Sequence, residues 1–345
     1  MSQDETDYGD GAGSGYASAA SAATATASGD GSYGSGHGGA PVVSFDNVSK
    51  LYGRLRAVDG LTLDLRAGET VALLGPNGAG KSTSLDMLLA LRKPTSGQIQ
   101  MFGSDPYNAV KSGRVGAMLQ SGGLMPEVTV RELVTLVTTL HPKPEPINTT
   151  LKRAGIAQFA DQRVDRLSGG QTQRVRFALA ICGKSELIVL DEPTAAMDVE
   201  TRRLFWNSMK EEVAQGRTLL FATHYLEEAD QAADRILVIN RGRLLADGTP
   251  AEIKERAGAK RLSLRLDQVD EPFLLGLPGL VNLEVRRHVV QIQSRDSDAT
   301  LYAILDAGYR PREIEVTSLG LEQAFLAITA EDDAANGHAY AGETN

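Results

Sequence analysis

The chain has 345 residues, enough for one large domain and a smaller one, and its hydrophobic fraction of 42% allows a sizeable buried core. The net charge of −9 lies at the two ends, because residues 1–40 carry five acidic groups, residues 331–345 carry four, and neither segment contains Lys or Arg. The formally neutral part between them excludes the basic field that is typical of a nucleic-acid-binding protein. The sequence also excludes a membrane-spanning helix, since no apolar run approaches the roughly 18 residues that one needs.

The single cysteine, Cys182, excludes a disulfide within the chain and a metal cluster built on cysteines. A small buried thiol of this kind indicates a reducing, cytosolic setting. If the protein serves a membrane process, we expect another chain to supply the membrane part.

The composition of the two ends of the chain predicts a tail at each end. Ten Gly, seven Ser and nine Ala make up 26 of residues 1–40. Such a segment buries too little apolar surface to offset the entropy that ordering would remove, so we expect it to be disordered. The acidic stretch 331–345 is predicted to be a second tail.

Residues 41–255 predict an α/β domain. The segments VVSFDNV and LTLDL alternate apolar and polar residues, as strands of an antiparallel β layer do. Short apolar runs then alternate with helical stretches, which indicates a largely parallel and covered central sheet beside that layer. A mostly helical insert is predicted at about 104–180. The predicted strands are 70–74, 115–119, 187–190, 218–222 and 235–239, and the predicted helices are 81–91, 129–140, 168–182, 200–214 and 225–232.

From about residue 260 the pattern changes to strand, helix, two strands that flank a tight turn, helix and strand. This order predicts a small C-terminal α+β domain of the ferredoxin-like kind over 260–330, which ends in a helix at about 320–328.

A phosphate-binding loop follows the strand at 70–74 and opens the next helix. The segment matches the pattern G-x-x-x-x-G-K-[ST], in which glycines turn successive N–H groups toward one anion and the helix N-terminus adds a favourable dipole. We expect Lys81 to reach the β- and γ-phosphates of ATP and the Ser82 hydroxyl to bind Mg²⁺. The predicted loop consists of Gly75, Pro76, Asn77, Gly78, Ala79, Gly80, Lys81, Ser82 and Thr83.

An acidic pair follows the apolar strand at 187–190. Asp191 stands where a carboxylate can hold Mg²⁺, and Glu192 can polarise the attacking water. A solvated acidic pair is the alternative for an isolated Asp-Glu, but the phosphate loop earlier in the chain favours the catalytic interpretation.

The segment Leu167-Ser168-Gly169-Gly170-Gln171 reads LSGGQ. Ser168 can cap a helix, and the two glycines allow a phosphate to approach the backbone closely. LSGGQ is the signature of the ABC transporter family. Because the phosphate loop, this signature and the acidic pair follow one another in the family's order, the chain resembles the ATPases of that family. The resemblance covers about residues 42–250.

The resemblance assigns roles to four further residues. Tyr52 stands where the family stacks an aromatic ring on adenine, although an ordinary exposed turn residue is the alternative. Gln120 resembles the glutamine that touches Mg²⁺ and water, and His224 resembles the switch histidine at the γ-phosphate. Asp198 resembles the aspartate after the acidic motif, although Ala195–Met197 depart from the family's usual small-Gly-Leu form.

The family resemblance implies ATP hydrolysis with Mg²⁺ in a homodimer, where the signature of one copy closes on the phosphate loop of the other. It also implies a separate membrane permease, with this chain bound peripherally at the cytoplasmic face. The segment THYLEEADQAADRI at 223–236 is similar to the daunorubicin-resistance type of bacterial drug exporters. That similarity predicts export of a drug-like or other hydrophobic substrate.

Two alternatives remain at this point. A soluble ABC ATPase acting on nucleic acid or ribosomes would be expected to carry long coiled coils, two cassettes or a basic surface, and the sequence predicts none of these. A non-catalytic regulatory module is disfavoured by the intact Lys81, Glu192 and His224.

Overall fold

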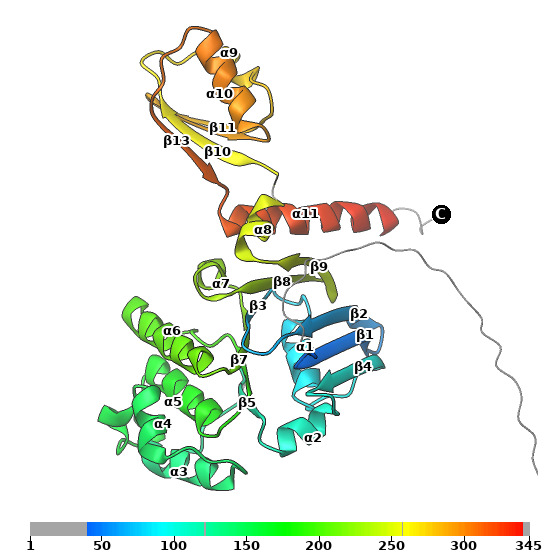
Figure 1. Ribbon diagram of the computed structural model, residues 1–345, viewed down its shortest axis with the longest axis vertical. Helices are drawn as coiled ribbons and strands as arrows, with labels where there is room; N and C mark the ends of the chain where they lie inside the picture. Colours follow the sequence, from blue (N-terminus) through cyan, green and yellow to red (C-terminus); the bar gives the residue numbers. More distant parts are fainter. Residues whose placement is uncertain (1–39, 121, 257, 341–345) are drawn as a thin grey trace, which may run out of the picture. The chain divides into compact units, whose positions relative to one another are not determined.

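The computed structural model describes residues 40–120, 122–256 and 258–340. The predicted disordered tail, 1–40, lies outside them apart from its last residue. A six-stranded sheet has the order β5-β6-β7-β3-β8-β9, and its neighbours pair in parallel except for the antiparallel pair β8 and β9 (Figure 1). Its strands are β3 (Thr70–Leu74), β5 (Val115–Met118), β6 (Leu187–Asp191), β7 (Thr218–Thr223), β8 (Arg235–Asn240) and β9 (Arg243–Gly248).

Both faces of this sheet are covered, which explains why its central strands are apolar throughout. Successive side chains of a strand point to opposite faces. In β3, Val71 and Leu73 therefore join one buried cluster, and Ala72 and Leu74 join another. The same alternation divides the side chains of β6 and β7 between the two clusters.

The cluster that contains Val71 and Leu73 lies against an antiparallel layer of three strands in the order β2-β1-β4. These strands are β1 (Val43–Tyr52), β2 (Leu55–Leu65) and β4 (Ser96–Met101), and α1 (Lys81–Leu88) contributes to the same core. The predicted α/β fold, with a mixed central sheet and an antiparallel layer, is confirmed. The strand β4 was not predicted, because only Ile99 and Met101 of its six residues are buried.

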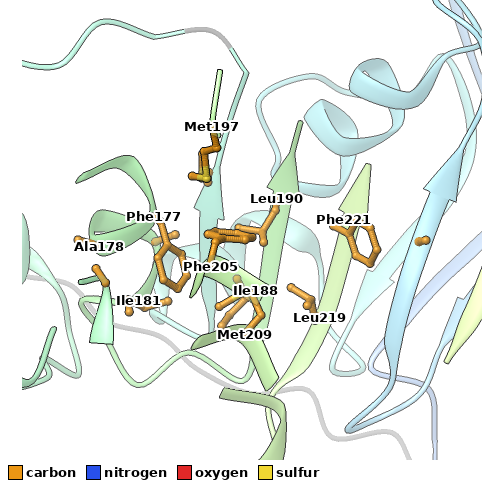
Figure 2. Close-up of a cluster of buried hydrophobic side chains, with 14 of the residues drawn as sticks. Phe177, Ala178, Ile181, Ile188, Leu190, Met197, Phe205, Met209, Leu219 and Phe221 are labelled. Carbon is orange, nitrogen blue, oxygen red and sulfur yellow. The ribbon is translucent and has the colours of Figure 1, made fainter. Parts of the chain in front are cut away.

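In the cluster that contains Ala72 and Leu74, side chains of α5 (Gly169–Ile181) and α6 (Val199–Ala214) pack on the other face of the sheet. Figure 2 shows Phe177 of α5 and Phe205 of α6 meeting over the side chains of β6 and β7, with ring centroids 4.9 Å apart. Trp206 continues the aromatic chain to Phe221 of β7, at 4.7 Å between centroids. Aromatic edge-to-face contacts of this kind add to the energy of burial, so they strengthen the packing of α6 on β7, the neighbour of the strand that carries the acidic pair.

The helical segment begins after β5, and the predicted bounds of the insert, 104–180, are therefore too wide. Residues 115–118 pair in parallel with β6, so they belong to the central sheet rather than to an insert. The segment that follows contains α3 (Val130–Leu140), α4 (Ile147–Arg153) and two 3₁₀ turns, Ala157–Phe159 and Val164–Arg166. The short α2 (Pro106–Lys111) precedes β5.

Residues 260–318 form a four-stranded antiparallel sheet in the order β11-β12-β10-β13. In its core, apolar side chains of the sheet pack with Leu274 of the helix at 271–275 and Ile304 of the helix at 297–306. Its assignment as a separate ferredoxin-like domain stays a prediction. The elements are β10 (Lys260–Arg265), α9 (Glu271–Leu275), β11 (Leu280–Arg286), β12 (Val289–Ser294), α10 (Ser297–Asp306) and β13 (Arg312–Ser318).

The last helix, α11 (Leu321–Tyr340), corrects two expectations. Leu321, Ala324 and Ile328 lie on one helix face and are buried in the cluster that covers the central sheet, not in the core of 260–318. The helix contacts α7 (Leu226–Ala232), α8 (Pro250–Glu255) and β9.

The predicted acidic tail is wrong for 331–340, because the helix continues through these residues. Asp332 accepts a hydrogen bond from Asn240 at 2.9 Å, and Asp333 forms an ion pair with Arg241 at 2.9 Å. Residues 341–345 lie outside the described part of the chain. Within the described residues, no helix is both long enough and apolar enough to cross a membrane.

Candidate active site

The loop between β3 and α1 has a backbone that only glycine allows at two positions. Gly80 has a φ of +102°, and a Cβ there would lie 2.4 Å from the Ala57 carbonyl oxygen. A Cβ on Gly75 would lie 2.4 Å from the Ile239 carbonyl oxygen. β2 and β8 therefore press on the loop from the sides of these two glycines, and a side chain at either position would displace it.

Lys81 is buried at the start of α1. Its ammonium donates to the Gly75 carbonyl at 2.6 Å and to the Pro76 carbonyl at 3.2 Å. Burial lowers the pKa of Lys81, and the carboxylates of Glu192 and Asp191 oppose that shift. The loop therefore holds the ammonium group of Lys81 against its own carbonyl oxygens, beside the predicted phosphate-binding N–H groups.

The acidic pair stands at the carboxyl end of β6, where open α/β sheets bind their ligands. Asp191 is 4% exposed and Glu192 is 5% exposed. Burial raises the pKa of Asp191, while the neighbouring Ser82 hydroxyl and Lys81 lower it. The Oδ1 atom of Asp191 is buried and has no hydrogen-bond partner among the described residues. A buried carboxylate oxygen of this kind suits a cation.

His224 follows β7 and lies beside the acidic pair. Its Nδ1 atom is 2.7 Å from Oε2 of Glu192, although its side chain is 51% exposed. Its ring packs against the ring of Tyr225, with centroids 4.1 Å apart. The structure thus brings together two predicted catalytic side chains from neighbouring strands, but His224 itself does not line the pocket described next.

A pocket of about 330 Å³ opens over the phosphate loop. It joins the predicted adenine contact Tyr52 and the predicted Gln120 and Glu192 to the loop. Leu55 and Ala57 also line the pocket and were not predicted. The apolar Leu55, only three residues after the predicted adenine contact Tyr52, is the sequence signal that could have indicated it. The other lining residues are Asn77, Gly78, Ala79, Gly80, Lys81, Ser82 and Thr83.

Tyr52 lies at the pocket mouth and is 38% exposed. Lys50 Nζ is 5.4 Å from its ring centroid, and the Arg92 guanidinium carbon is 5.6 Å from it. Tyr52 and its partner across the hairpin, Leu55, which is 67% exposed, together offer an apolar surface for a base.

The signature residues are not in this pocket. Ser168 caps α5, since its Oγ accepts from the Gln171 N–H at 3.3 Å while Gln171 Oε1 accepts from the Ser168 N–H at 2.9 Å. A Cβ on Gly169 would lie 3.3 Å from the Cβ of Ala196, and one on Gly170 would lie 3.6 Å from the Ala196 carbonyl oxygen. The two glycines therefore lie against the loop that follows the acidic pair.

Asp198, the remaining predicted nucleotide contact, caps α6 by accepting from the Thr201 N–H at 2.7 Å. That backbone hydrogen bond is the main cause that lowers the pKa of Asp198. Asp198 does not line the pocket either, so one copy of the chain holds only part of the predicted site.

Comparison with known proteins agrees with this geometry. Residues 58–195 match the model of the family described as ABC transporter. The Nod factor export ATP-binding protein I of Burkholderia lata is 37% identical over 223 residues, which are 62% of this chain and 72% of that protein. The daunorubicin resistance ATP-binding protein DrrA3 of Streptomyces coeruleorubidus is 32% identical over 305 residues, 84% of this chain and 96% of that protein.

Solved structures are similar as well, among them the following two. A dimeric ATP-binding cassette in a post-hydrolysis state, bound to ADP and Pi, superposes with a TM-score of 0.56 and 28% identity, covering 60% of this chain and 98% of that one. A bacterial Atm1-family ABC exporter with ATP bound superposes with a TM-score of 0.56 and 27% identity, covering 63% of this chain and 40% of that one.

Proposed function

We propose that this chain, which belongs to the ABC transporter family of ATP-binding proteins, is the ATP-hydrolysing subunit of a bacterial exporter. One observation carries the proposal. A single pocket joins the phosphate loop with Lys81 to Gln120 and Glu192, and Glu192 contacts His224 at 2.7 Å. Nucleotide binding and water activation therefore have their groups at one place.

The chemistry follows from the positions of these groups. The N–H groups of the loop and the start of α1 would receive the triphosphate, and Lys81 would offset its charge. Glu192 would orient a water for in-line attack on the γ-phosphorus, while the bond to the bridging oxygen breaks and ADP and phosphate leave. His224 would hold the Glu192 carboxylate and reach toward the γ-phosphate.

The residues present also fit Mg²⁺. Ser82 and Asp191 would hold the ion, and Gln120 would lie beside it. The unpartnered buried oxygen of Asp191 supports this assignment. When bound, Mg²⁺ neutralises charge on the phosphate oxygens.

The site is completed by a second copy. Ser168, Gly169, Gly170, Gln171 and Asp198 lie outside the pocket of their own chain, so they would meet the nucleotide of a partner copy across a two-fold axis. The likeness to a dimeric cassette supports this arrangement. ATP favours the closed pair because it contacts both copies only there.

Export is proposed from the relatives. One relative is named for Nod factor export and another for daunorubicin resistance, which favours export of a drug-like or other hydrophobic substrate. The membrane path would belong to a separate permease, with this chain bound to it at the cytoplasmic face. A role on nucleic acid or ribosomes finds no support in these similarities.

The variant Glu192→Gln tests the proposed function. It keeps the size of the side chain but removes the charge that polarises water, so we expect ATP turnover to fall about 10²–10⁴-fold. ATP binding should stay close to that of the wild type. Steady-state phosphate release and nucleotide binding measure the two effects.

Glu227→Gln is the matched control, since Glu227 is an exposed carboxylate on α7 outside the pocket. It should turn over ATP like the wild type. Near-normal turnover by Glu192→Gln would remove Glu192 from this role, and a wild type without turnover would contradict the proposed function itself.

A further inference from the structure

Glu228 is a buried carboxylate that the proposed mechanism does not use. It lies on α7, four residues after His224, and is 4% exposed. The Thr194 hydroxyl donates to its Oε1 atom, and the Thr223 hydroxyl donates to its Oε2 atom at 3.3 Å. The Arg202 Nε atom lies 3.2 Å from Oε1. Three segments of the chain thus meet on one side chain.

Two of these partners adjoin the predicted catalytic groups. Thr194 follows Glu192 by two residues, and Thr223 directly precedes His224. Both threonines are completely buried, and within the described residues each hydroxyl donates to Glu228. Glu228 therefore links the loop after β6 to the end of β7.

The third partner lies behind His224. The Arg202 guanidinium is 4.8 Å from the centroid of the Tyr225 ring, which in turn packs on the ring of His224 at 4.1 Å. Arg202 is on α6, whose start Asp198 caps. Glu228 consequently fixes, through Arg202 and Tyr225, the surface on which the His224 ring rests.

Glu192 needs such support because its backbone is strained. Its φ is +50°, a left-handed conformation that a non-glycine residue keeps only where its surroundings enforce it. Its N–H donates to the Ala222 carbonyl at 2.9 Å, which holds one side of the residue. The bond from Thr194 to Glu228 holds the chain on its other side.

We infer that Glu228 is a positioning residue for ATP hydrolysis, which keeps Glu192 and His224 in contact by tying Thr194, Thr223 and Arg202 together. The inference rests on the proposed function of the pocket. Burial raises the pKa of Glu228, and the hydrogen bond from Thr194 and the charge of Arg202 offset part of that rise. A positioning role explains why a charged group is kept there.

The variant Glu228→Ala tests the inference. It leaves Thr194 and Thr223 without their acceptor, and a displacement of about 1 Å at the reacting groups lowers a rate by about 10²-fold. We expect kcat to fall about 10- to 100-fold. The affinity for a non-hydrolysable ATP analogue should change by less than about twofold, because Lys81, Tyr52 and the loop are untouched.

A conservative variant separates position from charge. In Glu228→Gln the amide oxygen can still accept from Thr194, so kcat should stay within about threefold of the wild type. If Glu228→Ala does not fold, Thr194→Val takes its place. It removes one of the two bonds and should lower kcat by several-fold while nucleotide affinity is kept.

Two control variants distinguish a loss of positioning from a general loss of stability. Glu227→Ala removes the exposed neighbour on the same helix. Glu212→Ala removes a carboxylate that is 1% exposed and forms an ion pair with Arg217 at 3.0 Å, ten residues beyond Arg202 on α6. The folded protein should keep its kcat in both. The same loss of kcat in Glu212→Ala would overturn the inference.

A double-mutant cycle of Glu228→Ala and Glu192→Gln, measured by kcat, shows whether Glu228 acts through Glu192. If Glu228 acts through Glu192, then Glu228→Ala should lower the residual rate of Glu192→Gln by less than about threefold. Equal losses in both backgrounds, or normal kcat in Glu228→Ala, would overturn the inference and leave the proposed function intact. A wild type that does not hydrolyse ATP would overturn the proposed function instead.

Discussion

Gly80 shows how one residue determines the geometry of the nucleotide pocket. It caps the start of α1 with a φ of +102° and lies against the Ala57 carbonyl. The motif predicts the glycine, but it does not predict that β2 is the element pressing on it. In the same way, the sequence predicts Glu192 and His224 from their motifs, yet neither the 2.7 Å contact between them nor the role of Glu228 can be derived from spacing along the chain.

The variant Gly80→Ala should lower the free energy of unfolding by more than Gly78→Ala does. Both positions have positive φ, which costs a non-glycine residue about 1–2 kcal/mol. Only at Gly80 would the new Cβ also meet a backbone oxygen at 2.4 Å, whereas at Gly78 it would meet nothing within 4 Å. Urea unfolding measures both variants, and equal losses would contradict a close approach of β2.

At the scale of the elements, the buried strands and capped helices are the parts that the sequence predicts well. The prediction of 129–140 matches α3 because Thr129 and Glu132 form a capping box, in which Thr129 N–H donates to Glu132 at 2.8 Å. β4 and β9 were missed because few of their side chains are buried. The extent of α11 was missed because acidic composition suggested a tail, while its partners Asn240 and Arg241 lie far away in the sequence.

The variant Leu321→Ala tests whether α11 belongs to the core of the nucleotide-binding part. Leu321 is 3% exposed, so its truncation should lower the free energy of unfolding by about 2–4 kcal/mol. Trp206, the only tryptophan, lies in the cluster between the central sheet and α6 and reports the unfolding of that core by fluorescence.

Leu326→Ala is the control on the same helix, because Leu326 is 57% exposed and its loss should change stability by less than about 0.5 kcal/mol. A Trp206 transition that is unchanged in Leu321→Ala would place α11 outside this core.

At the scale of the whole molecule, one copy of the chain holds only part of the predicted site. The pocket supplies the loop, Gln120 and Glu192, whereas Ser168 and Asp198 cap helices outside it. The motifs predict all of these residues, but only the fold shows that they divide into two groups. Two copies related by a two-fold axis would bring the groups together and make ATP the link between them.

The most direct test is the mass of the Glu192→Gln chain in solution with Mg²⁺ and saturating ATP, measured by light scattering beside the wild type. We expect the variant to reach twice the mass of one chain and to remain there far longer than the wild type, because it binds ATP but hydrolyses it about 10²–10⁴-fold more slowly. The wild type should dimerise only briefly and return to the monomer as ATP is consumed. If both chains stay monomeric at saturating ATP, or if the wild type dimer persists as long as the variant's, the account of a shared site opened by hydrolysis is contradicted.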